Sequence, residues 1–293
     1  MSSRAAQASL LFAVVSFLVA IEPRVAARPT ERAALVTVIA DAGTPIRDLT
    51  ARDFVVKEDG KRAEVVDAKL TKDPLSVALL IDISQPPRGT ARSVQDLRNA
   101  ASAFVKTIHA VSPEAQIALV MFAAAPTTAT DFTNKSDELE TAISKIFPSQ
   151  QTVAVLMEAM LDSARKLEAR PAPRRAMVTI DFSSSEGSAD RTVQQAADAL
   201  TNSGATLWAV SVRGTAPTSA NREEVLNKMT KATGGKRFSS VESSGLEGML
   251  KNVAASLTSQ YVVTFTRPGD GTAKSTTFET VDGKKVLLTP FMR

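Results

Sequence analysis

The sequence has 293 residues, of which 44% are hydrophobic and 23% are charged, a composition typical of a folded globular protein. Its net charge of +4 comes from basic and acidic residues interleaved along the chain, without a basic stripe, so nucleic acid is not an expected partner. The sequence contains no cysteine, which excludes disulfide bonds and leaves stability to packing.

The first 27 residues have the pattern of a cleavable secretory signal peptide. Arg4 precedes an apolar stretch from Leu10 to Ile21, and the small residues of Val25–Ala27 suit a cleavage site. The stretch is too short to span a bilayer comfortably, and an uncleaved N-terminal anchor is the alternative. We therefore expect a secreted or periplasmic protein with no membrane insertion after signal removal.

Residues 28–73 are predicted to form an N-terminal β subdomain, because β-rich runs occur without a helical period. The Asp59-Gly60 pair between Asp53–Lys57 and Arg62–Leu70 predicts a hairpin. Its turn requires positive φ at both central positions, which this pair tolerates.

Residues 74–259 alternate continuous apolar runs with amphipathic patterns. Strands are predicted at Leu75–Ile83, Gln116–Phe122, Ala176–Phe182, Thr206–Val212 and Arg237–Val241, and helices at Ser93–Val111, Asp137–Ile146, Val155–Glu168, Arg191–Asn202, Arg222–Thr233 and Gly245–Ser259. Gly204 and Gly234 stand where helix C-terminal glycines belong. Strands that are apolar on both faces suit a parallel sheet covered by helices. This pattern predicts an α/β fold with a doubly wound, mostly parallel, Rossmann-like sheet.

Residues 260–293 return to β-rich sequence, with a second Asp-Gly pair at Asp282-Gly283. We expect a β-hairpin region here that packs with residues 28–73. Both ends of the mature chain would then build one small flanking β subdomain.

A carboxylate and a hydroxyl end the first apolar strand of the α/β region. Asp82 and Ser84 follow the run, and Pro86 and Pro87 come next. Ligands of open α/β sheets bind beyond the carboxyl ends of the strands, where the winding reverses, so Asp82 is expected at such a crevice. The structural alternative is that Asp82 only caps the following helix or accepts backbone N–H bonds.

The stretches LLIDISQP, QIALVMFA, VLMEAMLDSARKL, RRAMVTIDFSSSEGS and GATLWAVSVRG, in this order, resemble the von Willebrand factor type A domain. The flanking stretches TARDFVVKEDGKRAEVV and SLTSQYVVTFT are similar to the secreted bacterial group labelled VWFA-related. The resemblance covers nearly the whole mature chain and implies an adhesion or interaction module. Members with an intact metal-ion-dependent adhesion site carry D-x-S-x-S, a loop threonine and an aspartate after the fourth strand.

The first part of this motif is incomplete here. Asp82 and Ser84 match its first two ligand positions, but Pro86 stands at the third and has no side-chain oxygen. Mg²⁺ prefers six oxygen ligands in octahedral geometry, so a lost hydroxyl weakens the site.

The other two ligand positions are also altered. Ala154 falls at the threonine position, with Thr152 two residues earlier, and Phe182 falls at the aspartate position, directly after Asp181. Successive strand side chains point to opposite faces, so Asp181 does not simply replace Phe182 unless the strand ends early. We expect a degenerate metal site without a cofactor, in a partner-binding crevice formed by Asp82, Ser84, Pro86, Thr152, Ser183 and Ser184.

The sequence offers no sign of catalysis. It lacks a cysteine nucleophile, the G-x-S-x-G and H-E-x-x-H motifs and a phosphate-binding glycine motif, and the single histidine, His109, follows a core-facing Ile108. The expected function is therefore non-enzymatic binding of a protein partner in the cell envelope or extracellular space. The alternative is a Mg²⁺- or Mn²⁺-dependent adhesion protein that uses Asp82, Ser84, Thr152 and Asp181. An unrecognised hydrolase or a purely structural envelope protein forms a third class.

Overall fold

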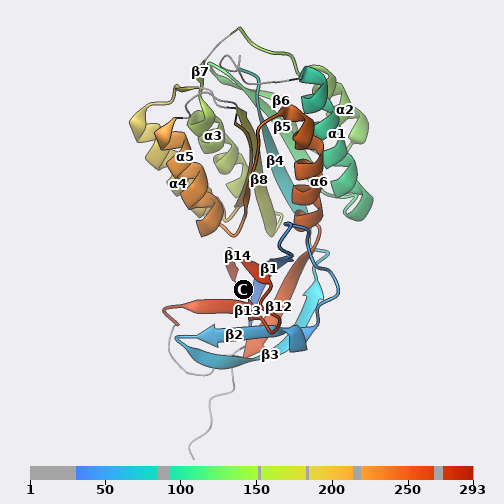
Figure 1. The fold of residues 1–293 in the computed structure, drawn as a ribbon, viewed down its shortest axis with the longest axis vertical. Coiled ribbons are helices and arrows are strands. Elements are labelled where there is room, and N and C mark those ends of the chain that lie inside the picture. Colours follow the sequence, from blue (N-terminus) through green and yellow to red (C-terminus); the bar gives the residue numbers. More distant parts are fainter. Residues whose placement is uncertain are drawn as a thin grey trace, which may run out of the picture.

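The computed structural model describes residues 31–84, 93–150, 153–182, 185–213, 219–266 and 273–292. They form an α/β part, at the top of Figure 1, and an antiparallel β part below it. The predicted signal peptide lies outside the described residues.

One six-stranded sheet forms the centre of the α/β part. Its order is β11-β10-β8-β4-β5-β6. The strands are β4 (Leu75–Asp82), β5 (Gln116–Phe122), β6 (Pro126–Thr133), β8 (Arg174–Phe182), β10 (Thr206–Val212) and β11 (Arg237–Ser240). All pairs are parallel except β5 with β6. The predicted mostly parallel sheet is confirmed. Strand β6 was not predicted, because its polar sequence, PTTATDFT, lacks an apolar strand pattern.

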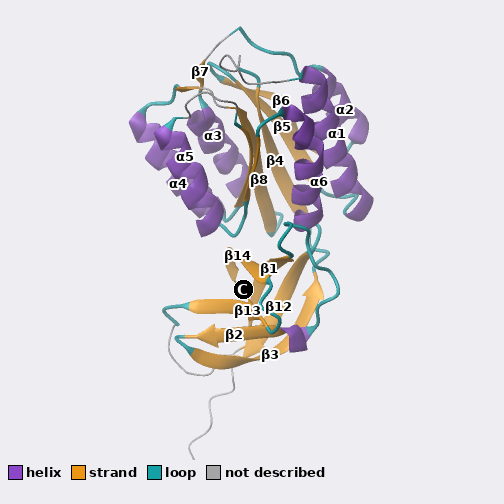
Figure 2. Ribbon diagram, in the orientation of Figure 1, coloured by secondary structure: helices purple, strands orange, loops and turns teal. Residues whose placement is uncertain are grey.

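Helices cover both faces of this sheet (Figure 2). One face carries α1 (Val94–Val111), α2 (Ser136–Ser144) and α6 (Leu246–Leu257), and the other carries α3 (Leu156–Glu168), α4 (Asp190–Ser203) and α5 (Ala220–Ala232). Every residue of β4 is buried, as a central strand covered on both sides requires. Among the described helices, none is long and apolar enough to cross a bilayer.

The antiparallel part is built from both ends of the chain, as predicted. Its order is β13-β2-β3-β12-β1-β14. These strands are β1 (Glu31–Ile39), β2 (Phe54–Glu58), β3 (Lys61–Leu70), β12 (Gln260–Thr266), β13 (Thr276–Thr280) and β14 (Lys285–Met292), with a 3-10 turn η1 (Ala51–Asp53) before β2. Asp59 and Gly60 have φ of 48° and 79°, and β2 pairs with β3, which confirms the predicted hairpin.

The C-terminal strands do not form the hairpin expected from Asp282-Gly283. Strand β13 pairs with β2 and strand β14 with β1, at opposite ends of the strand order. Gly283 has a φ of 74°, but Asp282 does not have the positive φ that a two-residue hairpin turn of this kind requires. An isolated two-stranded hairpin is only marginally stable, whereas pairing with N-terminal strands places β13 and β14 in a six-stranded sheet.

The two parts share a packed junction. Ile39 and Leu287 of the β part belong to the core cluster of the α/β part. The buried guanidinium of Arg174 donates from Nη1 to the carbonyl of Asp73 at 3.0 Å, from Nε to Oε1 of Gln260 at 3.0 Å, and from Nη2 to the carbonyl of Leu257. Arg174 therefore ties together both chain crossings between the parts.

Candidate functional site

Three polar side chains lie next to one another where β4, β8 and β10 end. Asp181 pairs with Ser211 in the parallel register, and Ile81 pairs with Ile180, so Asp82 and Asp181 follow side by side. All three polar side chains are buried. Because side chains alternate along a strand, they share the face that α3, α4 and α5 cover, opposite the core that contains Phe182.

Asp82 organises the end of its own strand. Its Oδ1 accepts hydrogen bonds from the backbone N and the Oγ of Ser84, at 2.8 and 2.6 Å, and its Oδ2 accepts from the backbone N of Phe182 at 3.3 Å. It does not cap α1, because the Oγ of Ser93 accepts from the backbone N of Asp96 there. The helix-capping alternative is therefore wrong, whereas Asp82 does accept backbone N–H bonds.

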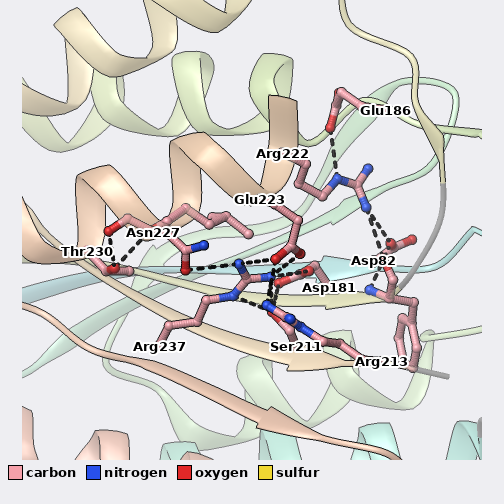
Figure 3. Close-up of polar contacts among 12 residues, drawn as sticks. Asp82, Asp181, Glu186, Ser211, Arg213, Arg222, Glu223, Asn227, Thr230 and Arg237 are labelled. Atoms are coloured by element: carbon pink, nitrogen blue, oxygen red, sulfur yellow. Dashed lines mark hydrogen bonds and ion pairs between the residues drawn. The ribbon is translucent and has the colours of Figure 1, made fainter. Parts of the chain in front are cut away.

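Arg222, in the first turn of α5, projects its guanidinium to the same place (Figure 3). Its Nη1 lies 3.8 Å from Oδ2 of Asp82 and donates to the carbonyl of Phe182 at 3.0 Å. Its Nη2 donates to the carbonyl of Ala154 at 3.1 Å, and its Nε donates to Oε2 of Glu186 at 3.0 Å. Only 2% of this side chain is exposed. Ala154 lies in β7 (Val153–Ala154), which pairs with β9 (Ser185–Glu186).

A second arginine, Arg237, lies beside the neighbouring carboxylate of Asp181. Arg237 donates from Nη2 to the Oγ of Ser211 at 2.8 Å and to Oε1 of Glu223 at 2.7 Å, and this nitrogen lies 3.9 Å from Oδ2 of Asp181. Figure 3 shows Arg237 among Asp181, Ser211, Glu223 and Asn227, beside the Arg222 group. Two arginines, with side chains 2% and 7% exposed, thus face two buried aspartates at the carboxyl end of the sheet.

The environment of Asp181 favours its neutral form. Burial raises the pKa of this carboxyl to about 6, although Arg222, Arg237 and the hydrogen bond from Ser211 pull the pKa down. The nearby charge of Asp82 adds to the increase. Asp181 therefore holds its proton more tightly than an exposed aspartate does.

The structure brings only some of the predicted site residues together. Asp82 is hydrogen-bonded to Ser84 and lies beside Asp181, while Pro86, Thr152, Ser183 and Ser184 lie outside the described residues. Ala154 and Phe182 both contribute a backbone carbonyl, although neither side chain carries an oxygen. No three His, Cys, Asp or Glu side chains within the described ranges are placed to hold a metal ion.

Sequence reasoning missed Arg222, Arg237 and Glu223. One signal was present for Arg222, because a basic residue in the first turn of a helix opposes the positive end of the helix dipole. A residue placed against that preference needs a compensating partner, and here Asp82 and Glu186 provide it.

The chain belongs to the von Willebrand factor type A domain family. The family model matches residues 76–253, which is more than half of the chain and includes β4 through most of α6. This confirms the resemblance drawn from the sequence. A sequence comparison with curated proteins gave no match.

Solved structures share the fold at low identity. The minor pilin PilB from Streptococcus sanguinis aligns with a TM-score of 0.53 at 10% identity, over 64% of this chain and 62% of the pilin. A von Willebrand factor type A protein from Catenulispora acidiphila aligns with a TM-score of 0.52 at 10% identity, over 88% of this chain and 72% of its own. Proximal thread matrix protein 1 from the mussel byssus gives 0.51 at 18%, over 67% and 48%. The chain thus spans about 62% of the pilin's length, and the likeness is one of fold.

Proposed function

We propose that this chain is an exported, non-enzymatic protein-binding module whose contact surface is the carboxyl-end rim of its type A domain and whose binding needs no divalent ion. Membership of the family and the likeness in fold to a bacterial pilin support an interaction role. Binding would rest on shape and apolar contact, not on a metal that captures a partner's carboxylate.

The observation that carries this proposal is the position of Arg222. Its positive charge lies 3.8 Å from Asp82, the one carboxylate that matches the metal motif, and both side chains are buried. A divalent ion bound to Asp82 would meet this charge at short range, where the protein screens repulsion weakly. The residues described here therefore do not fit a divalent ion while Arg222 stays in place.

Exposed apolar side chains around the same end of the sheet support a contact surface. Phe147, Val153 and Val241 are 62%, 39% and 69% exposed. The Phe147 loop is tied to the end of β4, because the backbone N of Ser149 donates to the carbonyl of Ile83 at 2.7 Å. Val153 lies in β7, and Val241 follows β11 directly. We call these three residues the apolar rim.

Capture of a partner tests the rim. The mature wild-type chain would be immobilised and exposed to the extracytoplasmic proteins of its source cells, beside a Phe147→Ser/Val153→Ser/Val241→Ser variant. We expect the rim variant to lose partners that wild type retains. A matched control replaces two exposed valines of the β part, Val66→Ser and Val281→Ser, and should bind as wild type does. Equal recovery by the rim variant would contradict the proposal.

Export is testable separately. The signal-peptide hypothesis predicts that protein recovered from the periplasm or the medium begins at Arg28, as measured by N-terminal sequencing. Protein that keeps residues 1–27 and sediments with membranes would instead support the uncleaved anchor.

The alternative, a Mg²⁺- or Mn²⁺-dependent adhesion protein, would require the Arg222 guanidinium to leave Asp82. Thermal unfolding of the wild-type chain with and without millimolar Mg²⁺ or Mn²⁺ separates the two. Saturating a true site at a hundred times its dissociation constant would add roughly 2.7 kcal/mol, or about 5–10 °C for a domain of this size. We expect no such increase.

A further inference from the structure

Among the residues that the structure describes, four oxygen atoms from four separate segments surround the Arg222 guanidinium. They are Oδ2 of Asp82 at the end of β4, the carbonyl oxygen of Ala154 in β7, the carbonyl oxygen of Phe182 at the end of β8, and Oε2 of Glu186 in β9. We call this set the oxygen cage. Three of the four accept a hydrogen bond of 3.0–3.1 Å from the guanidinium, and the fourth faces it at 3.8 Å.

We propose that Arg222 is the resident cation of this site: the oxygen cage is a cation-binding place that its guanidinium fills permanently, so that removing the side chain exposes a latent divalent-ion site. The proposal rests on the proposed function, in which the type A domain works without a bound metal.

The donor set carries the first part of the argument. Two carboxylates and two backbone carbonyls are hard oxygen donors, the kind that hold Ca²⁺, Mg²⁺ or Mn²⁺ in proteins. Two of the donors come from Ala154 and Phe182, positions whose side chains supply no oxygen. The main chain therefore presents to the arginine the oxygen atoms that those side chains lack.

The chemistry of the arginine side chain also supports the proposal. A guanidinium keeps its charge at all physiological pH values and offers five N–H donors directed outward in one plane. Such a group can satisfy acceptors that converge from several directions, as a metal ion does. With only 2% of its side chain exposed, Arg222 is held inside the cage and does not reach a partner's surface.

Charge within the cage carries the third part. Glu186 is itself nearly buried, at 4% exposure, and Asp82 is fully buried. Without a cation between them, two buried carboxylates would repel one another and lose their solvation, so the cage favours a positive occupant. If the Arg222 side chain is removed, the two carboxylates still favour a positive ion between them.

The test measures thermal unfolding of the mature chain by Trp208 fluorescence, in metal-free buffer and with millimolar MnCl₂, CaCl₂ or MgCl₂ at matched ionic strength. We expect the wild type to be unchanged and Arg222→Ala to gain about 5 °C or more with at least one of these ions. The double variant Arg222→Ala/Asp82→Asn should lose that gain, because it lacks one carboxylate of the cage.

Arg174→Ala is the matched control. Arg174 is also buried and also donates to two backbone carbonyls, but its third acceptor is the amide of Gln260 and not a carboxylate. This variant should lose stability without any response to divalent ions. A response of equal size would show that the effect is general to destabilised variants and would overturn the proposal.

If Arg222→Ala is unfolded in metal-free buffer, the proposal requires that a divalent ion restores its far-ultraviolet circular dichroism. An absence of any ion effect on Arg222→Ala, folded or unfolded, overturns the proposal, and so does a wild-type chain that responds as strongly as the variant. Since no partner is needed in this assay, its failure would leave the rim proposal standing. Failure of partner capture would likewise leave the cation result intact.

Discussion

The guanidinium of Arg222 lies 3.8 Å from the carboxylate of Asp82, and the two side chains are 2% and 0% exposed. They come from α5 and β4, 140 positions apart in the sequence, and meet at the end of the central strand. Hydrogen bonds from Ser84 and Phe182 stabilise the Asp82 carboxylate, and the guanidinium adds an opposite charge beside it. The pair, together with Glu186, turns the centre of the type A domain into a closed polar site.

Loss of the Arg222 charge should destabilise the fold. Arg222→Met keeps most of the side-chain volume but leaves Asp82 and Glu186 without their cation, and removing one partner of a buried pair costs roughly 3–5 kcal/mol. Urea unfolding at pH 7 measures the loss. The control Lys251→Met removes an exposed ion pair with Glu247 and should change stability by less than about 1 kcal/mol. Equal losses for both variants would contradict the account.

Asp181 should make stability depend on pH with an unusual sign. Burial raises its pKa from 3.8 to about 6, so the folded state binds this proton more tightly than the unfolded state does. Its contribution is then most favourable below about pH 4, falls as the pH rises to about 6, and is constant above that. The free energy of unfolding of wild type minus that of Asp181→Asn should therefore fall by roughly 3 kcal/mol across this range.

Unfolding measured in urea at several pH values between 4 and 8 checks this slope. The exposed acid Asp67, whose pKa is lowered by its hydrogen bond with Lys69, serves as the control. For Asp67→Asn, the free energy of unfolding of wild type minus that of the variant should not fall as the pH rises. Parallel curves for wild type and Asp181→Asn would contradict the prediction.

Gly234 and Gly204 offer a matched pair for the junction between the two parts. Both follow helices with positive φ, at 70° and 64°. A Cβ at Gly204 would meet no atom within 4 Å, whereas a Cβ at Gly234 would clash with the backbone carbonyl of Leu288 in β14. Gly204→Ala should cost only the left-handed strain of about 1–2 kcal/mol. Gly234→Ala should cost clearly more stability, and thermal unfolding of the two variants measures the difference. Equal losses would contradict this prediction, because they would mean that β14 shifts to accommodate the Cβ at little cost.

Arg174 should couple the unfolding of the two parts. The chain has one tryptophan and one tyrosine: Trp208 lies in the α/β core, and Tyr261 lies in the core of the β part. In the wild type we expect Trp208 fluorescence and Tyr261 near-ultraviolet absorption to change at the same urea concentration. In Arg174→Ala, which loses the bonds to Asp73, Leu257 and Gln260, the two transitions should separate. Coincident transitions in this variant would show that apolar packing alone holds the parts together.

Local patterns predicted most of this fold because they carry their own physical signal. The continuous apolar run of β4 specifies a strand buried on both faces, and Asp59-Gly60 specifies a tight turn. Strand β6 escaped prediction because an edge strand needs no apolar alternation. The pairing of β13 with β2 escaped it because local sequence gives the turn but not the partner.

Only part of the candidate site could be predicted from the sequence. The motif led to Asp82 and Ser84, because their place after a strand fixes where they lie. Arg222 could not be found in this way, since its role depends on backbone carbonyls of Ala154 and Phe182, and any residue type provides a carbonyl. Side-chain alternation holds at the end of β8: Phe182 lies in one core, and Asp181 lies on the opposite face, beside Asp82.

The most direct measurement is anomalous X-ray diffraction from crystals of the wild-type chain grown with millimolar MnCl₂. We expect continuous density for the Arg222 side chain between Asp82, Glu186 and the carbonyls of Ala154 and Phe182, and no manganese peak within that cage. A manganese peak bonded to a carboxylate oxygen of Asp82, with the Arg222 side chain displaced, would contradict it.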